Sequence, residues 1–587
     1  MIKILKNLTK KEWILMIFVI LFVVLQVGLD LKMPDYMSEI TKLVQTKGSH
    51  MNDILKNGGY MLLCAFGSLI AAIVTGYLTA NISANFSFIV REKIFHKVED
   101  FSMKEIKDFS TSSLITRTTN DITHIEMLIS MGLQLLIKAP ITAIWAVSKI
   151  LNKSWEWSML TGGAVVILLS VIGVIVSIVV PRFKIVQKLI DKVNGVTREN
   201  LTGIRVVRAL NAETYQEEKF EKVNNDLTNL QLSNQKIFAI MQPIMYLVMN
   251  GLALLIYYIG ALLIKDADMI SKVGIFGDMI VFSSYAMQVI MSFLMLAFIF
   301  MTLPRAQVSI NRINEVLDKE ISIKDGFLNK NKTKQRGTVE FKNVSFKYHD
   351  AEEYLLKDIS FKVNKGETIG IIGSTGSGKS TLINLIPRFY DVTEGEVLVD
   401  GVNVKKYKEE FLYNKLGYVP QKAILFNGTV SSNISFGDNG KGIIGEKKIK
   451  ESAQVSQAEE FIEKMNEKYD SHIAQGGTNV SGGQKQRLSI ARAIARDPEI
   501  YIFDDSFSAL DYKTELNLRK NLKKNNKCAT NIIVSQRIGT IINADKIIVL
   551  DQGKIVGQGT HKELLNNCEV YKQIALSQLT EEELKNG

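Results

Sequence analysis

Long hydrophobic runs dominate the first half of this chain. Six stretches are almost continuously apolar, and each is about as long as a helix that crosses a bilayer, which needs roughly 20 residues. Buried helices of a soluble protein are rarely so long and so uniformly apolar. The pattern therefore predicts six membrane-spanning helices, at residues 13–29, 60–80, 132–150, 159–180, 237–264 and 273–303.

The segments between these runs alternate in character. Segments 81–131 and 181–236 are long, charged and rich in basic residues, and they keep a helical periodicity. Lysines also precede the first run, and basic residues favour the cytoplasmic side of a membrane. We therefore expect a multi-pass protein of the cell membrane. Both chain termini and the two long connections would lie in the cytoplasm, with the membrane helices extending into it.

The second half has the pattern of a soluble α/β domain. Residues 339–348 alternate between apolar and polar side chains, as an antiparallel strand does, and the apolar runs 368–372 and 500–504 are typical of buried strands. A hydrophilic, lysine-rich stretch separates the two halves. The predicted organisation is a transmembrane domain at 1–320, a linker at 321–336 and a second domain at 337–587.

The clearest chemical signal is a glycine-rich loop in the second domain. Residues 373–380 read Gly-Ser-Thr-Gly-Ser-Gly-Lys-Ser, which fits the phosphate-binding pattern G-x-x-x-x-G-K-[ST] between a strand and a helix. Its backbone N–H groups can close around a phosphate at the positive end of the helix dipole. Lys379 would reach the β- and γ-phosphates, and Ser380 would hold Mg²⁺. The sequence thus predicts a site for a nucleoside triphosphate and Mg²⁺.

Composition and charge change this picture little. The 587 residues have a mean hydropathy of +0.10 and a formal net charge of +11. A basic protein can bind nucleic acid, but no compact basic patch with interleaved aromatic residues stands out here. We therefore favour a cytoplasmic excess of lysine and arginine in a membrane protein as the explanation of the charge. We expect a lipid membrane as partner and no nucleic acid.

Two further motifs accompany the phosphate loop. Ser481-Gly482-Gly483-Gln484 begins a predicted helix with Ser481 as its N-cap, and the apolar strand 500–504 ends in the carboxylates of Asp504 and Asp505. In this combination, and over essentially the whole length, the chain resembles ABC transporters of the exporter type. The resemblance implies an all-α six-helix transmembrane domain plus an α/β P-loop ATPase domain of ABC type, fused in one chain.

The resemblance also implies a role for each motif. Tyr348 would stack on adenine, and Gln421 would touch both Mg²⁺ and the attacking water. Segments 113–121 and 202–213 would be coupling segments that transmit movement to the membrane helices. The ATP-binding residues would be Tyr348, Gly373, Ser374, Thr375, Gly376, Ser377, Gly378, Lys379, Ser380 and Thr381; the Mg²⁺ ligands would be Ser380, Gln421 and Asp504; and the signature, which binds ATP held by the opposite subunit, would be Ser481, Gly482, Gly483 and Gln484.

Two positions depart from the catalytic pattern of this family. Asp505 stands where the family has a glutamate as general base, and one methylene fewer withdraws the carboxylate by about 1.5 Å. Gln536 stands where the family has a switch histidine, and glutamine cannot carry a proton as histidine does. The predicted catalytic residues are Asp505, Gln536 and Gln421. The four residues of the signature match the family. This combination resembles the degenerate-site subunit of bacterial heterodimeric multidrug exporters, so we expect a second, homologous half-transporter as partner.

The transported compound is less defined by the sequence. The last two apolar runs are weakly charged and rich in methionine, including Met241, Met245 and Met249 at a helical spacing. Flexible, polarizable side chains suit an adaptable apolar pocket, although ordinary helix packing accounts for any single methionine equally well. We expect ATP-driven export of small amphipathic or hydrophobic compounds, drugs or lipids. The alternatives are a homodimeric pump, an exporter dedicated to a peptide, and an ATP-dependent membrane sensor or regulator.

Overall fold

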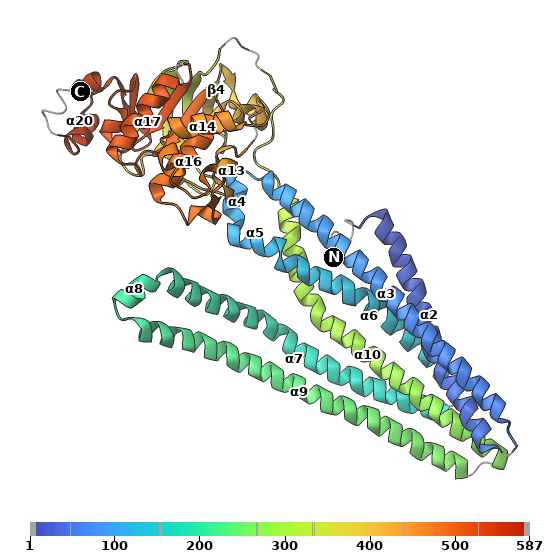
Figure 1. Ribbon diagram of the computed structural model, residues 1–587. Coiled ribbons are helices and arrows are strands. Elements are labelled where there is room, and N and C mark those ends of the chain that lie inside the picture. Colours follow the sequence, from blue (N-terminus) through green and yellow to red (C-terminus); the bar gives the residue numbers. More distant parts are fainter. Residues whose placement is uncertain are drawn as a thin grey trace. The chain divides into compact units, whose positions relative to one another are not determined.

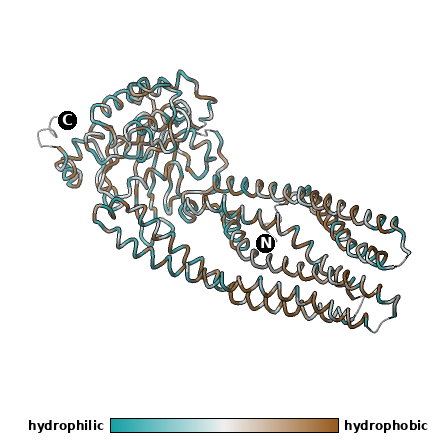
Figure 2. Tube along the Cα trace, turned by 60° about the horizontal axis from the view of Figure 1, so that its bottom comes forward, coloured by the Kyte–Doolittle hydropathy of each residue, from teal (hydrophilic) through white to brown (hydrophobic). Residues whose placement is uncertain are grey.

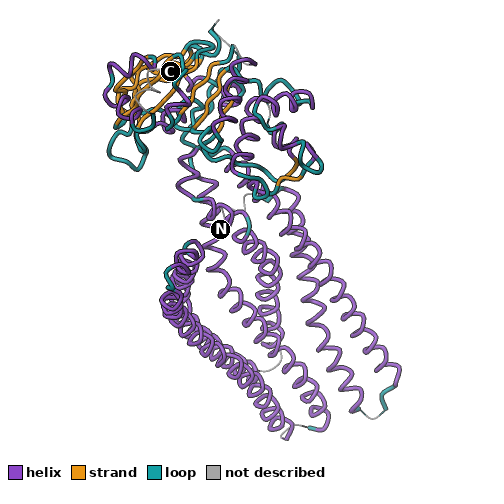
Figure 3. The backbone as a smooth tube through the Cα atoms, turned by 60° about the vertical axis from the view of Figure 1, so that its left-hand side comes forward, coloured by secondary structure: helices purple, strands orange, loops and turns teal. Residues whose placement is uncertain are grey.

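The computed structural model describes residues 8–46, 48–151, 155–265, 268–330, 333, 335–437, 439–525 and 528–579. The chain divides into two compact units. The first comprises Met1–Glu99 and Ser110–Lys319, and the second comprises Asp100–Phe109 and Glu320–Gly587. All strands among the described residues belong to the second unit (Figure 3).

The first unit is built from long helices (Figure 1). Within the described residues, six helical segments are long and apolar enough to cross a membrane, which confirms the predicted fold class. Figure 2 shows hydrophobic residues concentrated along these helices. The helices of this unit are α2 (Lys10–Gln45), α3 (Met51–Glu99), α5 (Thr111–Thr118), α6 (Asn120–Leu151), α7 (Trp155–Thr202), α8 (Ile204–Ala209), α9 (Glu213–Lys265) and α10 (Met269–Asp318).

Helix pairs in this unit pack side by side along much of their length. Helix α2 packs on α3, α6 on α10, and α7 on α9 (Figure 1). Within this apolar setting Asp35 accepts hydrogen bonds from the Tyr285 hydroxyl at 2.8 Å and from Lys149 Nζ at 2.8 Å. Lys138 Nζ lies 3.3 Å from Asp30. Because unpaired charges are costly inside a membrane, these contacts tie α2 to α6 and α10.

The predicted coupling segments fall on short helices and their flanks. Segment 113–121 covers α5 and the start of α6, where Arg117 donates to the Arg312 carbonyl at 2.7 Å and pairs with Glu315 at 2.9 Å. Asp121 accepts from the Ser309 hydroxyl at 2.7 Å. These bonds fix the segment to the C-terminal part of α10, within the first unit. Segment 202–213 contains α8, also in the first unit. The coupling role of both segments stays a prediction.

In the part of the second unit that the structure describes, there are two main sheets and a two-stranded ribbon. The antiparallel sheet has the order β2-β1-β4-β5, and the larger sheet has the order β12-β11-β3-β10-β9-β6, parallel except for β12 at its edge. The strands are β1 (Val339–Phe346), β2 (Leu356–Val363), β3 (Thr368–Gly373), β4 (Glu394–Val399), β5 (Val402–Asn403), β6 (Leu416–Val419), β7 (Gly428–Thr429), β8 (His472–Ile473), β9 (Ile500–Asp504), β10 (Thr530–Val534), β11 (Lys546–Asp551) and β12 (Lys554–Gly559).

Helices cover the larger sheet, and a further helix of this unit comes from the first half of the sequence. Strand β3 is buried on both faces, since Ile371 belongs to one hydrophobic cluster and Ile372 to another. A short helix from residues 100–109 belongs to this unit. The helices are α4 (Met103–Phe109), α11 (Lys379–Asn384), α12 (Glu409–Tyr413), α13 (Val430–Ile434), α14 (Glu446–Val455), α15 (Glu459–Ile462), α16 (Gly482–Ala495), α17 (Tyr512–Asn525), α18 (Ile538–Ile541), α19 (His561–Asn567) and α20 (Glu569–Leu576).

A buried lysine supports the edge of the larger sheet, and it provides a stability prediction. Lys415 is only 4% exposed and pairs with Asp400 at 2.7 Å, and with Glu499 at 3.2 Å. Removing one partner of a buried ion pair leaves the other charge uncompensated and costs about 3–5 kcal/mol. Lys415→Met is therefore expected to lower the free energy of unfolding of the second unit by that amount, measured on the full chain by pulse proteolysis in urea.

The matched control is Lys441→Met. Lys441 and its partner Asp497 are both more than half exposed, and exposed pairs contribute about 0–1 kcal/mol. Equal effects of the two substitutions would contradict a structural role for the buried pair.

Candidate nucleotide site

The carboxyl ends of parallel strands bring the predicted site residues to one edge of the larger sheet. Strand β3 leads into the phosphate loop, β6 leads to Gln421, β9 ends at Asp504 with Asp505 directly after it, and β10 leads to Gln536. These four strands are consecutive in the order β3-β10-β9-β6. In open α/β sheets, ligands bind at this edge.

The phosphate loop has the backbone conformation that its glycines allow. Gly378 has a φ of +95° and serves as the N-cap of α11. At Gly373, an added Cβ would lie 2.0 Å from the Leu550 carbonyl oxygen, so only glycine fits. Lys379 donates to the carbonyls of Gly373 at 2.9 Å and Ser374 at 2.7 Å. Burial lowers the pKa of Lys379, although the nearby Asp505 and Asp504 oppose that shift. The ammonium is thus held inside the loop, where phosphate oxygens would replace the carbonyls.

The predicted Mg²⁺ ligands are oxygen atoms at the same edge. Ser380 Oγ donates to Asp504 Oδ1 at 2.9 Å. Burial raises the pKa of the Asp504 carboxyl, and the negative charge of Asp505 adds to this shift. A buried carboxylate beside a hydroxyl is a donor set that suits Mg²⁺ bridging to nucleotide phosphates. The residues present therefore fit the ion.

The three predicted catalytic side chains meet at one carboxylate oxygen. Asp505 Oδ2 accepts from Gln421 Nε2 at 3.4 Å and from Gln536 Nε2 at 3.3 Å. Asp505 has a φ of +45°, a strained conformation for a residue with a side chain. Burial raises the pKa of Asp505, while the hydrogen bonds from Gln536 and Gln421 oppose that shift. Two amide groups thus surround the carboxylate that stands where a general base is expected.

Tyr348 lies against the phosphate loop. Its hydroxyl is 3.0 Å from Thr381 Oγ1, and its ring packs edge-on against Phe346 and Tyr390. Lys107 of α4 lies 5.6 Å from the ring centroid and forms an ion pair with Asp350 at 3.1 Å. A cavity of about 560 Å³ lies beside Tyr348. None of residues 373–381 lines this cavity, so the stacking of Tyr348 on a base stays a prediction.

The predicted stacking role of Tyr348 gives an expectation for ATP affinity. Base–aromatic stacking contributes about 1–3 kcal/mol, so Tyr348→Ala is expected to weaken ATP binding roughly 5- to 150-fold. Tyr348→Phe keeps the ring and loses only the contact with Thr381, and it is expected to bind ATP within about threefold of the native chain. Equilibrium binding of ATP to the purified full-length chain measures both. Equal losses for the two variants would contradict stacking.

The signature residues form the beginning of α16. Ser481 accepts from the Gln484 N–H at 3.3 Å, and the Gln484 side chain accepts from the Ser481 N–H at 2.9 Å, which is the predicted N-cap completed as a capping box. Ser481 and Gly482 are exposed. Among the described residues, no hydrogen bond or ion pair joins the signature to the phosphate loop of the same chain.

Two contributors to this region were not predicted from the sequence. Lys107 reaches Tyr348 from a short helix far away in the chain, and Gln578 contacts the loop that carries Gln536. Neither residue belongs to a recognisable motif. The basic character of the first long connection was a signal for membrane topology and carried no information about a contact with Tyr348.

Comparisons with known proteins agree with this architecture. The family description "ABC transporter transmembrane region" matches residues 16–293, and "ABC transporter" matches residues 356–508. An uncharacterized ABC transporter ATP-binding protein of Mycobacterium tuberculosis is 39% identical over 89% of this chain and 87% of its own length. The Bacillus subtilis protein YfiB, also an uncharacterized ABC transporter ATP-binding protein, is 34% identical over 88% of both chains.

Two further relatives extend the comparison. The ATP-dependent lipid A-core flippase of Pseudomonas aeruginosa is 30% identical over 86% of this chain and 82% of its own. The solved structure of a bacterial Atm1-family ABC exporter with ATP bound superposes with a TM-score of 0.80 over 96% of this chain and 98% of that chain, at 23% identity. That likeness supports the fold.

Fold and site together define the class of this protein. Six apolar helices in one unit and a P-loop α/β unit in the same chain are the parts of an ATP-hydrolysing membrane transporter with fused domains. The chain belongs to the ABC transporter family, as an exporter with fused transmembrane and nucleotide-binding domains. It is a membrane protein that binds ATP and hydrolyses it for transport.

Proposed function

We propose that this chain is one half of a heterodimeric ABC exporter whose own ATP site is degenerate. The observation that carries this proposal is the pair Asp505 and Gln536 at the catalytic edge of the sheet. The side chain of Asp505 is one methylene shorter than that of glutamate, so its carboxylate would lie farther from the attacking water. A displacement of about 1 Å can cost roughly a hundredfold in rate. ATP at this site would be held much longer than it would take to hydrolyse at a complete site.

The surroundings of Asp505 support this assignment. Its Oδ2 atom accepts from the amides of Gln421 and Gln536, so its acceptor capacity is partly used within the protein. An amide of Gln536 cannot take up and return a proton as a histidine can. Lys379 and Ser380 of the phosphate loop, with Asp504 at the end of β9, retain the chemistry that binds MgATP. The site is thus suited to binding and poorly suited to turnover.

The partner would supply the second, competent site. The exposed start of α16 carries an unaltered Ser481-Gly482-Gly483-Gln484 sequence. In the proposed dimer this signature closes over the ATP held by the partner, where a glutamate and a histidine would complete hydrolysis. The nucleotide-binding domain and both termini would face the cytoplasm. Stable ATP at the degenerate site would keep the two ATPase units associated and bias the conformational cycle.

We further propose amphipathic or hydrophobic compounds, drugs or lipids, as the exported class. An apolar groove of about 610 Å³ lies between α7 and α9, lined by residues such as Met159, Leu160, Leu252 and Leu255. The relative in Pseudomonas aeruginosa is named for the flipping of a lipid, which is consistent with this class. None of Met241, Met245 and Met249 lines the groove, so the predicted methionine face has no support there.

A transport assay tests this function. The exporter, purified with any co-purifying partner, is reconstituted into inside-out vesicles, and ATP-dependent accumulation of fluorescent amphiphiles, labelled phospholipid and labelled peptides is measured. We expect ATP-dependent accumulation that non-hydrolysable ATP does not support. Accumulation of peptides alone would favour a dedicated peptide exporter. ATP binding without accumulation of any of these compounds would favour a sensor or regulator.

A further inference from the structure

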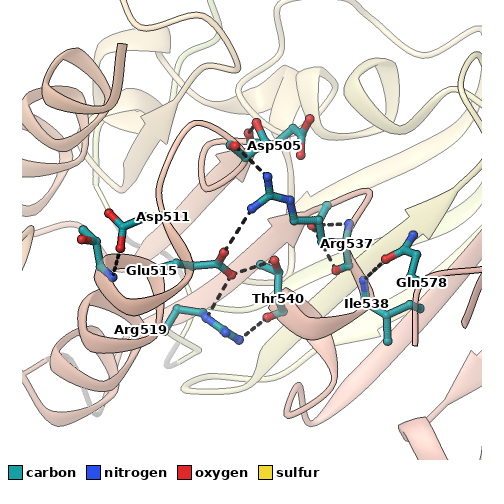
Figure 4. Close-up of polar contacts among 11 residues, drawn as sticks. Asp505, Asp511, Glu515, Arg519, Arg537, Ile538, Thr540 and Gln578 are labelled. Atoms are coloured by element: carbon teal, nitrogen blue, oxygen red, sulfur yellow. Dashed lines mark hydrogen bonds and ion pairs between the residues drawn. The ribbon is translucent and has the colours of Figure 1, made fainter. Parts of the chain in front are cut away.

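The side chain of Gln578, near the C-terminus, forms hydrogen bonds with the backbone of the loop that carries Gln536. Gln578 follows α20, and its Nε2 atom donates to the Gln536 carbonyl at 2.7 Å. Its Oε1 atom accepts from the Ile538 N–H at 2.9 Å. Figure 4 shows Gln578 lying beside Ile538, with Arg537 turned toward the loop of Asp505. The Gln578 amide thus binds a backbone carbonyl before Arg537 and a backbone N–H after it.

The backbone geometry explains why this contact matters. Ile538 is the first residue of α18, and the N-cap residue Arg537 makes no side-chain capping bond. The first N–H groups of a helix have no partner within the helix, so the Gln578 oxygen takes the place of a cap. Without it the Ile538 N–H would lose its partner, and the Gln536 carbonyl would lose its donor.

The segment that presents Gln578 is itself well anchored. Tyr571 and Ala575 of α20 are fully buried, and the Tyr571 hydroxyl lies 2.7 Å from His561 Nδ1. Leu579 packs against the hydrophobic cluster that contains Ile538. Packed residues thus anchor the segment that presents the exposed Gln578 side chain to the loop.

The other side of the loop is fixed from the catalytic region. Arg537 pairs with Glu515 of α17 at 3.8 Å (Figure 4). It also donates to the Ser508 carbonyl at 3.0 Å, and Gln536 donates to Asp505. The loop is thus held between the residues that follow β9 and the C-terminal segment. A shift of the Gln536 backbone would carry its side chain away from Asp505.

We propose that Gln578 is a positioning residue of the nucleotide site, which holds the 536–538 backbone so that the Gln536 side chain faces Asp505. This proposal rests on the role assigned above to Gln536. It makes the segment after α20 a support of the ATP site that acts through the backbone of residues 536–538.

Hydrogen exchange on the full-length chain in lipid nanodiscs, with and without MgATP, tests this role. The variants are Gln578→Leu, which removes both hydrogen bonds, and Gln578→Glu, which keeps the acceptor for the Ile538 N–H. The control is Gln573→Leu on the exposed face of α20. In the native chain MgATP is expected to slow exchange at both 373–381 and 536–541. In Gln578→Leu we expect exchange at 536–541 to be about tenfold faster, with no slowing by MgATP, while 373–381 still responds.

Each outcome of this experiment decides the proposal. An intermediate result for Gln578→Glu and native behaviour for Gln573→Leu would support it. Unchanged exchange at 536–541 in Gln578→Leu would overturn it, and so would loss of the MgATP response at both segments, because that would indicate a general structural role. A native chain without any MgATP response at 536–541 would also overturn it. The degenerate-site function fails separately, if restoring Asp505→Glu and Gln536→His gives no gain in hydrolysis.

Discussion

Replacing Asp505 by glutamate and Gln536 by histidine together is expected to raise ATP hydrolysis at this chain's own site by about a hundredfold. The glutamate returns the carboxylate to the distance at which it can take a proton from the attacking water. The histidine supplies a group that can change protonation state at neutral pH. Gln421 already lies 3.4 Å from the same carboxylate, so the remaining part of the constellation is in place.

Single-turnover hydrolysis by the exporter purified together with its partner, which supplies the opposite signature, measures this gain. Each single substitution is expected to recover only part of it, because the two groups act on one reaction. Adding Lys379→Met to the double variant should remove the gained activity, which assigns it to this phosphate loop and not to a co-purifying partner. Unchanged turnover in the double variant, with ATP binding intact, would contradict a degenerate site.

Gly483→Asp is expected to reduce hydrolysis by the complete exporter about 10²- to 10³-fold, while ATP binding to this chain's own loop remains. A carboxylate at the start of α16 would oppose the charge that develops on the γ-phosphate held by the partner, and loss of one such stabilising contact costs this much in rate. An added Cβ at Gly483 would also lie 3.3 Å from the Ala509 carbonyl oxygen.

Gly445→Asp is the matched control for this substitution. Gly445 is the N-cap of α14, has open space around it, and has a φ of −76°, so an aspartate is tolerated there and suits the position. Steady-state hydrolysis by the exporter and photoaffinity labelling of this chain by an ATP analogue separate the two sites. If Gly483→Asp abolished labelling of this chain and left hydrolysis intact, the signature would not serve a partner's ATP.

The sequence predicted those features that depend on local patterns. Six apolar runs and their lengths require helices across a membrane, and the glycine loop between β3 and α11 requires the phosphate-binding turn. The capping box at Ser481 was predictable because both partners lie within three residues. The meeting of Gln421, Asp505 and Gln536 followed from the family resemblance, and the parallel order of β6, β9 and β10 gives its physical reason.

Contacts between residues distant in sequence were not predictable. Helix α4 has only seven residues, too few for a periodic signal, and its membership of the second unit arises from tertiary packing. The Gln578 side chain binds backbone atoms of Gln536 and Ile538. Because residues of many types offer the same backbone carbonyl and N–H groups, no sequence motif marks this contact. Neither contact leaves a pattern in the sequence.

Affinity purification of this chain from its native membranes tests the central claim most directly. The protein is extracted in mild detergent, and the co-purifying chains are identified and quantified by mass spectrometry. The account predicts a second ABC exporter chain in equal amount, with a glutamate at the position that corresponds to Asp505 and a histidine at the position that corresponds to Gln536. Recovery of this chain only as a homodimer that hydrolyses ATP rapidly at its own Asp505 sites would contradict the account.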